Sequence, residues 1–275
     1  MTEFSRELID HWSDRLLRSS GYEQRGFAAG FDANRPAAPE VLADILSLEA
    51  RVDRPRLVVD LGSGTGLSTR VWADRADEVV GVEASPEMCE QAEGAPADNV
   101  RFVQAYAQAT GLPEAGADIV TCSQALHWME PEPTLAEAAR ILRPGGVFAA
   151  YDYDWPPIVS WEVEAALEEL LRRVRAGRAP DGRGMRYSKE GHLERIKASG
   201  HFRYAREIVF HSRDRADAAR IVGMALSLGP LTVLLKDGKS EDELGLKALR
   251  ETAHRVLGDG EVDIYLGYRV RLGVR

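Results

Sequence analysis

The stretch VVDLGSGTGLST, residues 58–69, decides the fold of this 275-residue chain. It begins in RLVVDL (56–61), a short β-branched run that is typical of a buried parallel strand. It ends in LSTRVWADRA (67–76), which predicts a helix. The three glycines between them are Gly62, Gly64 and Gly66. Glycines at such a junction permit a tight turn and a close approach of the backbone to a ligand.

The spacing of the glycines separates three kinds of loop. The phosphate-binding loop of nucleotide triphosphatases needs a lysine after its glycines, and none follows here. The dinucleotide fingerprint G-x-G-x-x-G needs its third glycine at position 67, which is Leu67. Two acids complete the pattern: Asp60 ends the first predicted strand, and Glu83 ends the second, EVVGVEAS (78–85). Asp60 would suit an ammonium or sulfonium group, and Glu83 would accept both hydroxyls of a ribose.

Composition narrows the class of protein. The net charge of −9 disfavours a nucleic-acid partner, and we interpret the basic stretch 170–186 as a solvated helix end and loop. No apolar window is long enough for a membrane span, so we expect no membrane association. The N-terminus lacks the pattern of a secretory signal. With only two scattered cysteines as well, we expect a cytoplasmic protein.

Working outward from the loop, strands and helices alternate, which predicts an α/β fold with a parallel sheet and right-handed crossovers. Strands are predicted near 56–61, 78–83, 100–106, 117–123 and 147–153, and helices near 67–76, 86–93 and 131–142. Two alternating stretches, 201–212 and 262–274, predict the last two strands. We expect a helical cap or lid over residues 1–50, a ligand-binding core over 51–155, and completion of the sheet over 156–275. Helical insertions are predicted over about 156–187 and 213–260.

The motifs in this order resemble those of the class I S-adenosylmethionine (SAM) methyltransferases. The loop D-x-G-x-G-x-G followed by an acid after strand two resembles the first two motifs of that family. EASPEMCEQA (83–92), LPEAGADIVTCSQALHWM (112–129) and EAARILRPGGVFAA (137–150) resemble its later segments, so the resemblance covers about residues 55–155. It implies a Rossmann-like, seven-stranded sheet with helices on both faces, and SAM as the cofactor.

The resemblance also implies a set of cofactor-binding residues. The loop would hold the methionine end of SAM, Glu83 the ribose, and Met88 with segment 106–108 would flank the adenine. Tyr106 stands where the family often has an aspartate for the adenine amino group, so Ala107 or Gln108 would make that contact. Arg35 would meet a carboxylate of SAM or of the acceptor, or simply lie exposed. The full set of expected cofactor contacts is Asp60, Gly62, Ser63, Gly64, Gly66, Glu83, Ala84, Met88, Tyr106, Ala107, Gln108, Ser123 and Arg35.

The sequence motifs specify the acceptor-binding residues less closely than the cofactor-binding residues. The HW pair after strand four and FDANRPAAP (31–39) resemble a small-molecule subgroup that includes trans-aconitate and ubiquinone C-methyltransferase-like enzymes. His127 is the candidate base. Alternatively, His127 and Trp128 only pack in the protein or form a hydrogen bond to the cofactor. Tyr151 and Asp152, in YDYDWPP (151–157), are further catalytic candidates, unless that stretch is only a strand end and turn. Expected walls of the acceptor pocket are Tyr22, Phe27, Trp128, Tyr153 and Trp155. The histidines are not spaced like a metal site.

The hypothesis at this point is methyl transfer from SAM to a small-molecule acceptor by in-line displacement, with product S-adenosylhomocysteine. Two alternatives stay open. One is an NAD-dependent oxidoreductase, which Leu67 disfavours, and the other is a SAM-binding partner protein without catalysis. The chain would be a monomer or a homodimer.

Overall fold

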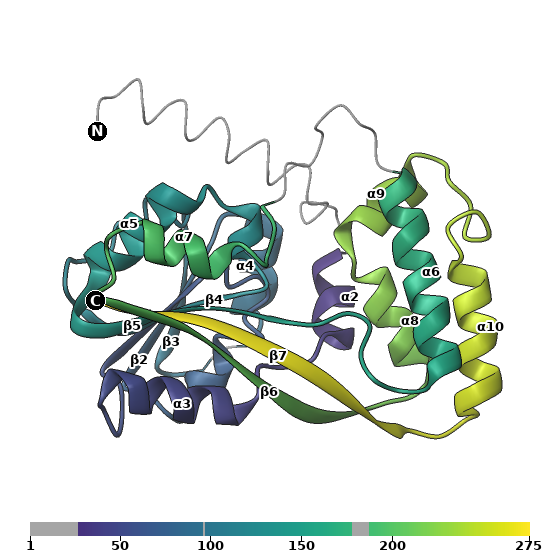
Figure 1. Cartoon of the computed structure of the whole chain (residues 1–275), viewed down its shortest axis with the longest axis horizontal. Coiled ribbons are helices and arrows are strands. Elements are labelled where there is room, and N and C mark those ends of the chain that lie inside the picture. The colour runs from purple at the N-terminus through teal and green to yellow at the C-terminus, as the bar shows by residue number, and fades with distance from the viewer. Residues whose placement is uncertain (1–26, 96, 178–186) are drawn as a thin grey trace.

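The structure is a computed structural model that describes residues 27–95, 97–177 and 187–275. Its centre is a seven-stranded sheet in the order β3-β2-β1-β4-β5-β7-β6, in which β7 alone runs antiparallel to its neighbours (Figure 1). The strands are β1 (Leu57–Leu61), β2 (Glu78–Glu83), β3 (Val100–Gln104), β4 (Ala117–Ser123), β5 (Leu142–Tyr153), β6 (Tyr204–Ala216) and β7 (Val262–Val274). The seven-stranded α/β fold that was predicted is confirmed. The antiparallel strand lies one place in from the edge, and β6 is the edge strand.

Helices cover both faces of the sheet. The helices are α2 (Phe27–Asn34), α3 (Glu40–Ala50), α4 (Pro86–Glu93), α5 (Pro131–Ile141), α6 (Trp161–Gly177), α7 (His192–Ala198), α8 (Ala218–Leu226), α9 (Gly229–Lys236) and α10 (Leu246–Leu257). α3 packs on one face, and α5 and α7 pack on the other (Figure 1). Adjacent residues of β1 pack in two separate apolar cores, because Val58 belongs to one buried cluster and Val59 to the other. Burial on both faces explains the unbroken apolar run of this strand.

The inserted helices gather beyond the carboxyl ends of the parallel strands. Figure 1 shows α6, α8, α9 and α10 as one bundle at that end of the sheet, with α2 between the bundle and the strands. Open α/β sheets bind ligands at this end. Among the described residues, no single helix is long and apolar enough to cross a membrane. α8 and α9 together have a sufficient length and composition, but they are bent by 76° at their junction.

Two local predictions were wrong and two lie outside the described residues. The helix expected at 67–76 is only a 3-10 turn, Arg70–Trp72, because the hydroxyls of Ser68 and Thr69 bond to Asp60 and hold this segment against β1. Strand β5 starts earlier than expected, at Leu142. Tyr22, expected in the wall of the acceptor pocket, and residues 178–186 of the basic stretch 170–186 are not described. The proposed division into domains stays a prediction.

Candidate active site

The glycine loop turns sharply at the end of β1. The backbone amides of Gly62 and Ser63 both donate to the carbonyl of Val82, at 2.7 and 3.1 Å, which ties the loop to β2. Gly62 has a φ of +68°, and a Cβ there would lie 2.6 Å from Cε of Met129. A side chain at this position would therefore be strained and would displace a cavity wall. The loop passes close to the strand tips because it carries no side chain here.

Asp60 lies beneath the loop and does not line the cavity above it. Its carboxylate is fully buried and accepts hydrogen bonds from Ser68 Oγ at 2.6 Å, Thr69 Oγ1 at 2.8 Å and Thr121 Oγ1 at 2.7 Å. Burial raises the pKa of Asp60, and the three hydroxyls oppose that rise. The direct ligand contact expected of Asp60 is therefore corrected to a positioning role, since its carboxylate binds the loop to β1 and β4.

Replacing Asp60 tests that positioning role. We expect Asp60→Ala to lower the free energy of unfolding by roughly 3 kcal/mol, because three buried hydroxyls lose their acceptor. Asp60→Asn keeps an oxygen and should cost less. Because the folded pKa of Asp60 is raised, the carboxyl group favours folding most below its unfolded pKa of 3.8, and this contribution is lost as pH rises through the folded pKa. Urea unfolding should thus show the Asn variant gaining on the wild type as pH rises, and a constant difference would contradict the burial argument.

Glu83 stands at the carboxyl end of β2 and faces the loop. One carboxylate oxygen accepts from the amide of Gly64 at 2.9 Å, and the other accepts from the amide of Ser85 at 2.8 Å. Burial raises the pKa of Glu83, whereas these backbone bonds act to lower it. The loop and the acid are therefore one unit, held together by the carboxylate itself.

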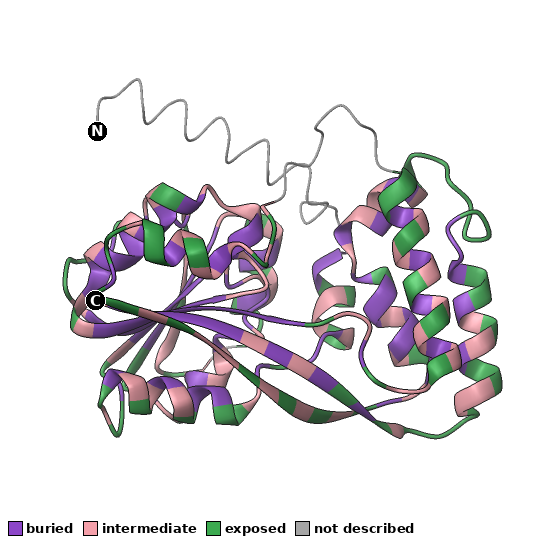
Figure 2. Cartoon of the chain, viewed as in Figure 1, coloured by how far each residue is buried: buried purple, intermediate pink, exposed green. Residues whose placement is uncertain are grey.

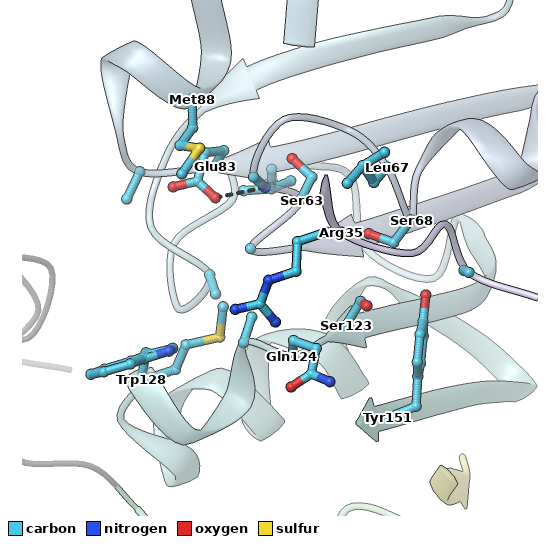
Figure 3. Close-up of a pocket in the computed structure, with 18 of the residues that line it drawn as sticks. Arg35, Ser63, Leu67, Ser68, Glu83, Met88, Ser123, Gln124, Trp128 and Tyr151 are labelled. Atoms are coloured by element: carbon cyan, nitrogen blue, oxygen red, sulfur yellow. Dashed lines mark hydrogen bonds between the residues drawn. The ribbon is translucent and has the colours of Figure 1, made fainter. Parts of the chain in front are cut away.

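A first cavity, here called the glycine-loop cavity, opens between this unit and the tips of β4 and β5 (Figure 3). It holds about 1200 Å³ of empty space, mouth included. Most of the expected cofactor contacts line it: Arg35, Gly62, Ser63, Gly64, Glu83, Ala84, Met88, Tyr106, Ala107, Gln108 and Ser123. Three expected pocket or catalytic residues line it too: Trp128, Tyr151 and Tyr153. Gly66 does not, because it packs against the ring of Phe102.

Arg35 lies at the junction of this cavity with a second one. Its guanidinium donates to Ser227 Oγ at 2.6 Å, to the Ser227 carbonyl at 3.0 Å and to the Tyr153 hydroxyl at 2.5 Å. It also lies 5.0 Å from the ring centroid of Phe31 and 5.3 Å from that of Trp155. Only 9% of the residue is exposed, and no carboxylate among the described residues forms an ion pair with it. A buried guanidinium without a counter-ion favours an anionic ligand nearby.

The second cavity, here called the charged cavity, lies between the strand tips and helices α6 and α9. It holds about 2120 Å³, open solvent included. Its wall includes the expected residues His127, Asp152 and Trp155. The two cavities share five wall residues: Phe31, Arg35, Gln124, Trp128 and Tyr153. Of the expected acceptor residues, Phe27 lines neither cavity, since it is buried in a small cluster with Ala28 and Met88.

A buried ion network forms one side of the charged cavity. Asp152 pairs with Arg271 at 3.1 Å and with Lys189 at 2.7 Å, and Nδ1 of His127 lies 3.8 Å from its carboxylate. Arg271 in turn pairs with Glu207 at 2.7 Å. His127 is 3% exposed and is placed by the turn after β4, through a bond from the amide of Tyr187 to its carbonyl. The structure thus brings His127 and Asp152 close together, although 3.8 Å is too long for a direct hydrogen bond between them.

Tyr151 is separate from that network. It lines the glycine-loop cavity, and burial raises its pKa well above the ordinary value of 10. Its hydroxyl therefore stays protonated at neutral pH and suits hydrogen bonding better than proton abstraction. The catalytic role expected of Tyr151 stays a prediction, and the raised pKa limits it to hydrogen bonding from a neutral hydroxyl.

We expect His192 to make the stability of the protein sensitive to acid. Its ring lies 6.4 Å from that of His127, and burial lowers its pKa to about 4. Because the unfolded pKa is 6.5, stability is full above pH 6.5 and falls as the pH drops through 4, by up to roughly 3 kcal/mol. We expect His192→Gln to flatten this part of the unfolding profile. His201→Gln, at an exposed histidine, is the matched control and should leave the slope unchanged.

Sequence reasoning missed several wall residues. Gln124 follows β4 with a φ of +50°, lines both cavities and accepts from Lys189 at 2.5 Å. Its place in SQALHW, just after a predicted strand, was a usable signal. Lys189, Glu207 and Arg271 carry no motif, and only the packing of distant segments brings them to the site. Within the described residues, no group of three or more histidines, cysteines or acids could hold a metal ion.

Known proteins resemble parts of this chain. A methyltransferase domain family matches residues 59–150. An uncharacterized methyltransferase of Mycobacterium tuberculosis is 36% identical over 122 residues, which is 44% of this chain and 48% of that protein. A trans-aconitate 2-methyltransferase of Methylobacterium radiotolerans is 40% identical over 121 residues, 43% of this chain and 44% of that protein. The chain spans about half the length of the curated relatives it matches.

Solved structures share the fold over most of the chain. A candidate type II methyltransferase from Anaeromyxobacter dehalogenans has a TM-score of 0.67 at 21% identity, covering 87% of this chain and 97% of that one. A candidate methyltransferase of an antibiotic biosynthesis pathway from Anabaena variabilis has a TM-score of 0.59 at 19% identity, covering 86% and 97%. Residues 59–150 of the chain therefore match a methyltransferase domain, and the chain shares the fold of these solved structures.

Proposed function

We propose that this protein binds SAM in the glycine-loop cavity and transfers its methyl group to a small-molecule acceptor in the charged cavity. The observation that carries the proposal is the Glu83 carboxylate, which holds the loop amide of Gly64 and lines the cavity that the loop encloses. The match of residues 59–150 to a methyltransferase domain supports the use of SAM.

The residues of the glycine-loop cavity fit that cofactor. Glu83 would accept the ribose hydroxyls, and Met88 with segment 106–108 would flank the adenine. Ser63 offers a buried hydroxyl with no hydrogen-bond partner among the described residues, and a Cβ at Gly64 would meet only open space. Polar groups left over in a cavity wall are typical of a site that completes its bonds with a ligand. Ser63 and Arg35 would bind the methionine end.

The chemistry needs positioning more than it needs a strong catalyst. Bound SAM supplies a methyl group on a positively charged sulfur. The chain must hold the acceptor in line with that group and exclude water, and such alignment is worth roughly 7–11 kcal/mol in favourable systems. Trp128 and Tyr153, which belong to both walls, are placed to set the position of the acceptor.

His127 would take the acceptor's proton where the acceptor has one to lose. It lines the charged cavity and not the glycine-loop cavity, so its ring faces the acceptor side. Asp152, 3.8 Å from Nδ1, would stabilise the imidazolium that forms. Lys189 and Arg271 hold Asp152 in place from the other side.

Arg35 decides whether the charges favour an anionic acceptor. Without it, the wall of the charged cavity carries four cationic residues, Arg175, Lys189, Arg269 and Arg271, against four acids, and Arg35 adds one positive charge where it faces the acceptor instead of the cofactor. Three of the acids, Asp152, Asp154 and Glu207, already pair with cations of that wall. Similarity to a trans-aconitate methyltransferase points the same way, towards a carboxylate. The cytoplasmic location expected from the sequence stays a prediction.

Titration and product assays test the proposal in two steps. Calorimetry with SAM, S-adenosylhomocysteine and NAD should give micromolar binding of the first two and none of NAD. Binding of NAD alone would instead support an oxidoreductase. Formation of S-adenosylhomocysteine is then measured with trans-aconitate and other small carboxylates, each beside its amide. Turnover that depends on the carboxylate supports the acceptor class, whereas SAM binding with no turnover on any acceptor supports a non-catalytic partner.

A further inference from the structure

The outer edge of β6 is long and open. This strand runs over 13 residues, Tyr204–Ala216, and within the described part of the chain it pairs with β7 alone. None of its residues from Tyr204 to Arg215 is buried, as its green and pink banding in Figure 2 shows. An edge strand of this kind presents unpaired backbone amides and carbonyls, which can pair with another strand.

The charges along this edge repeat in a self-complementary order. A positive and a negative residue, Arg206 and Glu207, are followed by a second such pair, Arg213 and Asp214. In an antiparallel pair of two β6 strands related by a two-fold axis at Phe210, Arg206 faces Asp214 and Glu207 faces Arg213. The two-fold axis repeats both contacts, which gives four pairs of opposite charges. Opposite charges facing each other across strands stabilise the pairing, and like charges destabilise it.

Neighbouring registers lose this match. A shift of one residue in one direction places Arg206 opposite Arg213. A shift in the other direction places Arg206 opposite Arg215 and Glu207 opposite Asp214. Either shift therefore sets like charges against each other. A shift of two residues places Glu207 opposite Arg215 and keeps two pairs of opposite charges instead of four. The charges therefore favour the register about Phe210 over these alternatives.

We propose that the β6 edge is a homodimer interface, in which two copies pair their β6 strands antiparallel about Phe210 and extend one sheet across both. Such an interface is self-complementary, as a two-fold dimer requires. Backbone hydrogen bonds supply the affinity and the charges set the register.

The four charges already have partners within the chain. Arg206 lies 3.8 Å from Glu49, Glu207 2.7 Å from Arg271, Arg213 3.6 Å from Asp263, and Asp214 2.7 Å from Arg220. The pairs of Arg206 and Arg213 are long and partly exposed, so these side chains can also reach across the edge. Glu207 lines the charged cavity. Arg213 of the second copy would therefore stand at the rim of that cavity.

Charge reversal tests the register. Sedimentation of the full chain at low ionic strength, over a concentration series, should give twice the monomer mass. Arg206→Asp sets like charges face to face and should raise the dimer dissociation constant roughly tenfold or more. Adding Asp214→Arg should restore the dimer. Lys247→Asp makes the same charge change at an exposed position on α10 and should leave the mass unchanged.

Cross-linking tests the position of the axis. The Cα atoms of the two copies of residue 210 would lie about 5 Å apart, a separation that suits a disulfide. Both native cysteines are buried, so Phe210→Cys should cross-link under mild oxidation and Arg206→Cys should not. A monomer at every concentration would overturn the proposal. So would an equal effect of Arg206→Asp and Lys247→Asp, or equal cross-linking of the two cysteine variants.

Discussion

Glu83→Ala is expected to weaken the binding of SAM and S-adenosylhomocysteine by about 100-fold or more. Hydrogen bonds to a charged group contribute roughly 1.5–3 kcal/mol each, and the ribose would lose two of them. The substitution also removes the acceptor for the amides of Gly64 and Ser85, so the loop loses its tie to the end of β2. Calorimetric titration of the variant measures the loss directly.

Glu78→Ala is the matched control for this experiment. Glu78 begins the same strand and is about half exposed, and among the described residues its one ion-pair partner is Arg101, at 3.0 Å. Its loss should leave the affinity for SAM unchanged. Glu83→Gln keeps the shape but not the charge, and should fall between the wild type and the alanine variant. Wild-type affinity in Glu83→Ala, with the protein folded, would show that the ligand binds elsewhere.

His127→Gln is expected to slow methyl transfer about 100-fold with an acceptor that must lose a proton. General bases contribute roughly 10²–10⁴-fold, and the amide cannot take up the proton. The affinity for SAM should stay within about twofold, since His127 lies outside the glycine-loop cavity. Single-turnover rates and titrations on the same preparation separate the two effects.

The choice of acceptor distinguishes a base from a packing residue. His127→Gln should slow transfer to an acceptor that must lose a proton, and should leave transfer to a carboxylate, which carries no such proton at neutral pH, close to the wild-type rate. Trp128→Phe is a useful comparison, because it alters the shared wall without removing the imidazole. An equal loss with both acceptors would make His127 a structural residue.

The loop and strand pattern allowed the fold to be predicted because its signals are local. The apolar runs of β1, β2 and β4 are buried on both faces of the sheet, so each is continuous in the sequence and easily found. The helix expected after the loop was wrong for a reason that is not local. Asp60 draws the hydroxyls of Ser68 and Thr69 towards β1, and their position relative to that carboxylate appears only in three dimensions.

The same distinction explains the site. The glycine-loop cavity was largely predicted, since the strand ends that form it each carry a recognisable motif. The charged cavity was not, because Lys189, Glu207 and Arg271 come from segments more than 30 residues away from His127 and Asp152 in the sequence. Asp60 shows a further limit of prediction from sequence. An acid at the end of a strand has the same sequence pattern whether its carboxylate faces a ligand or the loop above it.

The five residues common to both cavities would make the two proposed ligands thermodynamically dependent on each other. A molecule that fixes these side chains from one cavity also fixes the wall of the other cavity. The shared residues are Phe31, Arg35, Gln124, Trp128 and Tyr153. A first ligand that fixes these side chains removes entropy that the second would otherwise have to remove. Linkage then requires the cofactor to change the affinity for the acceptor by the same factor as the acceptor changes that for the cofactor. The strength of this coupling is thus a property of the shared wall.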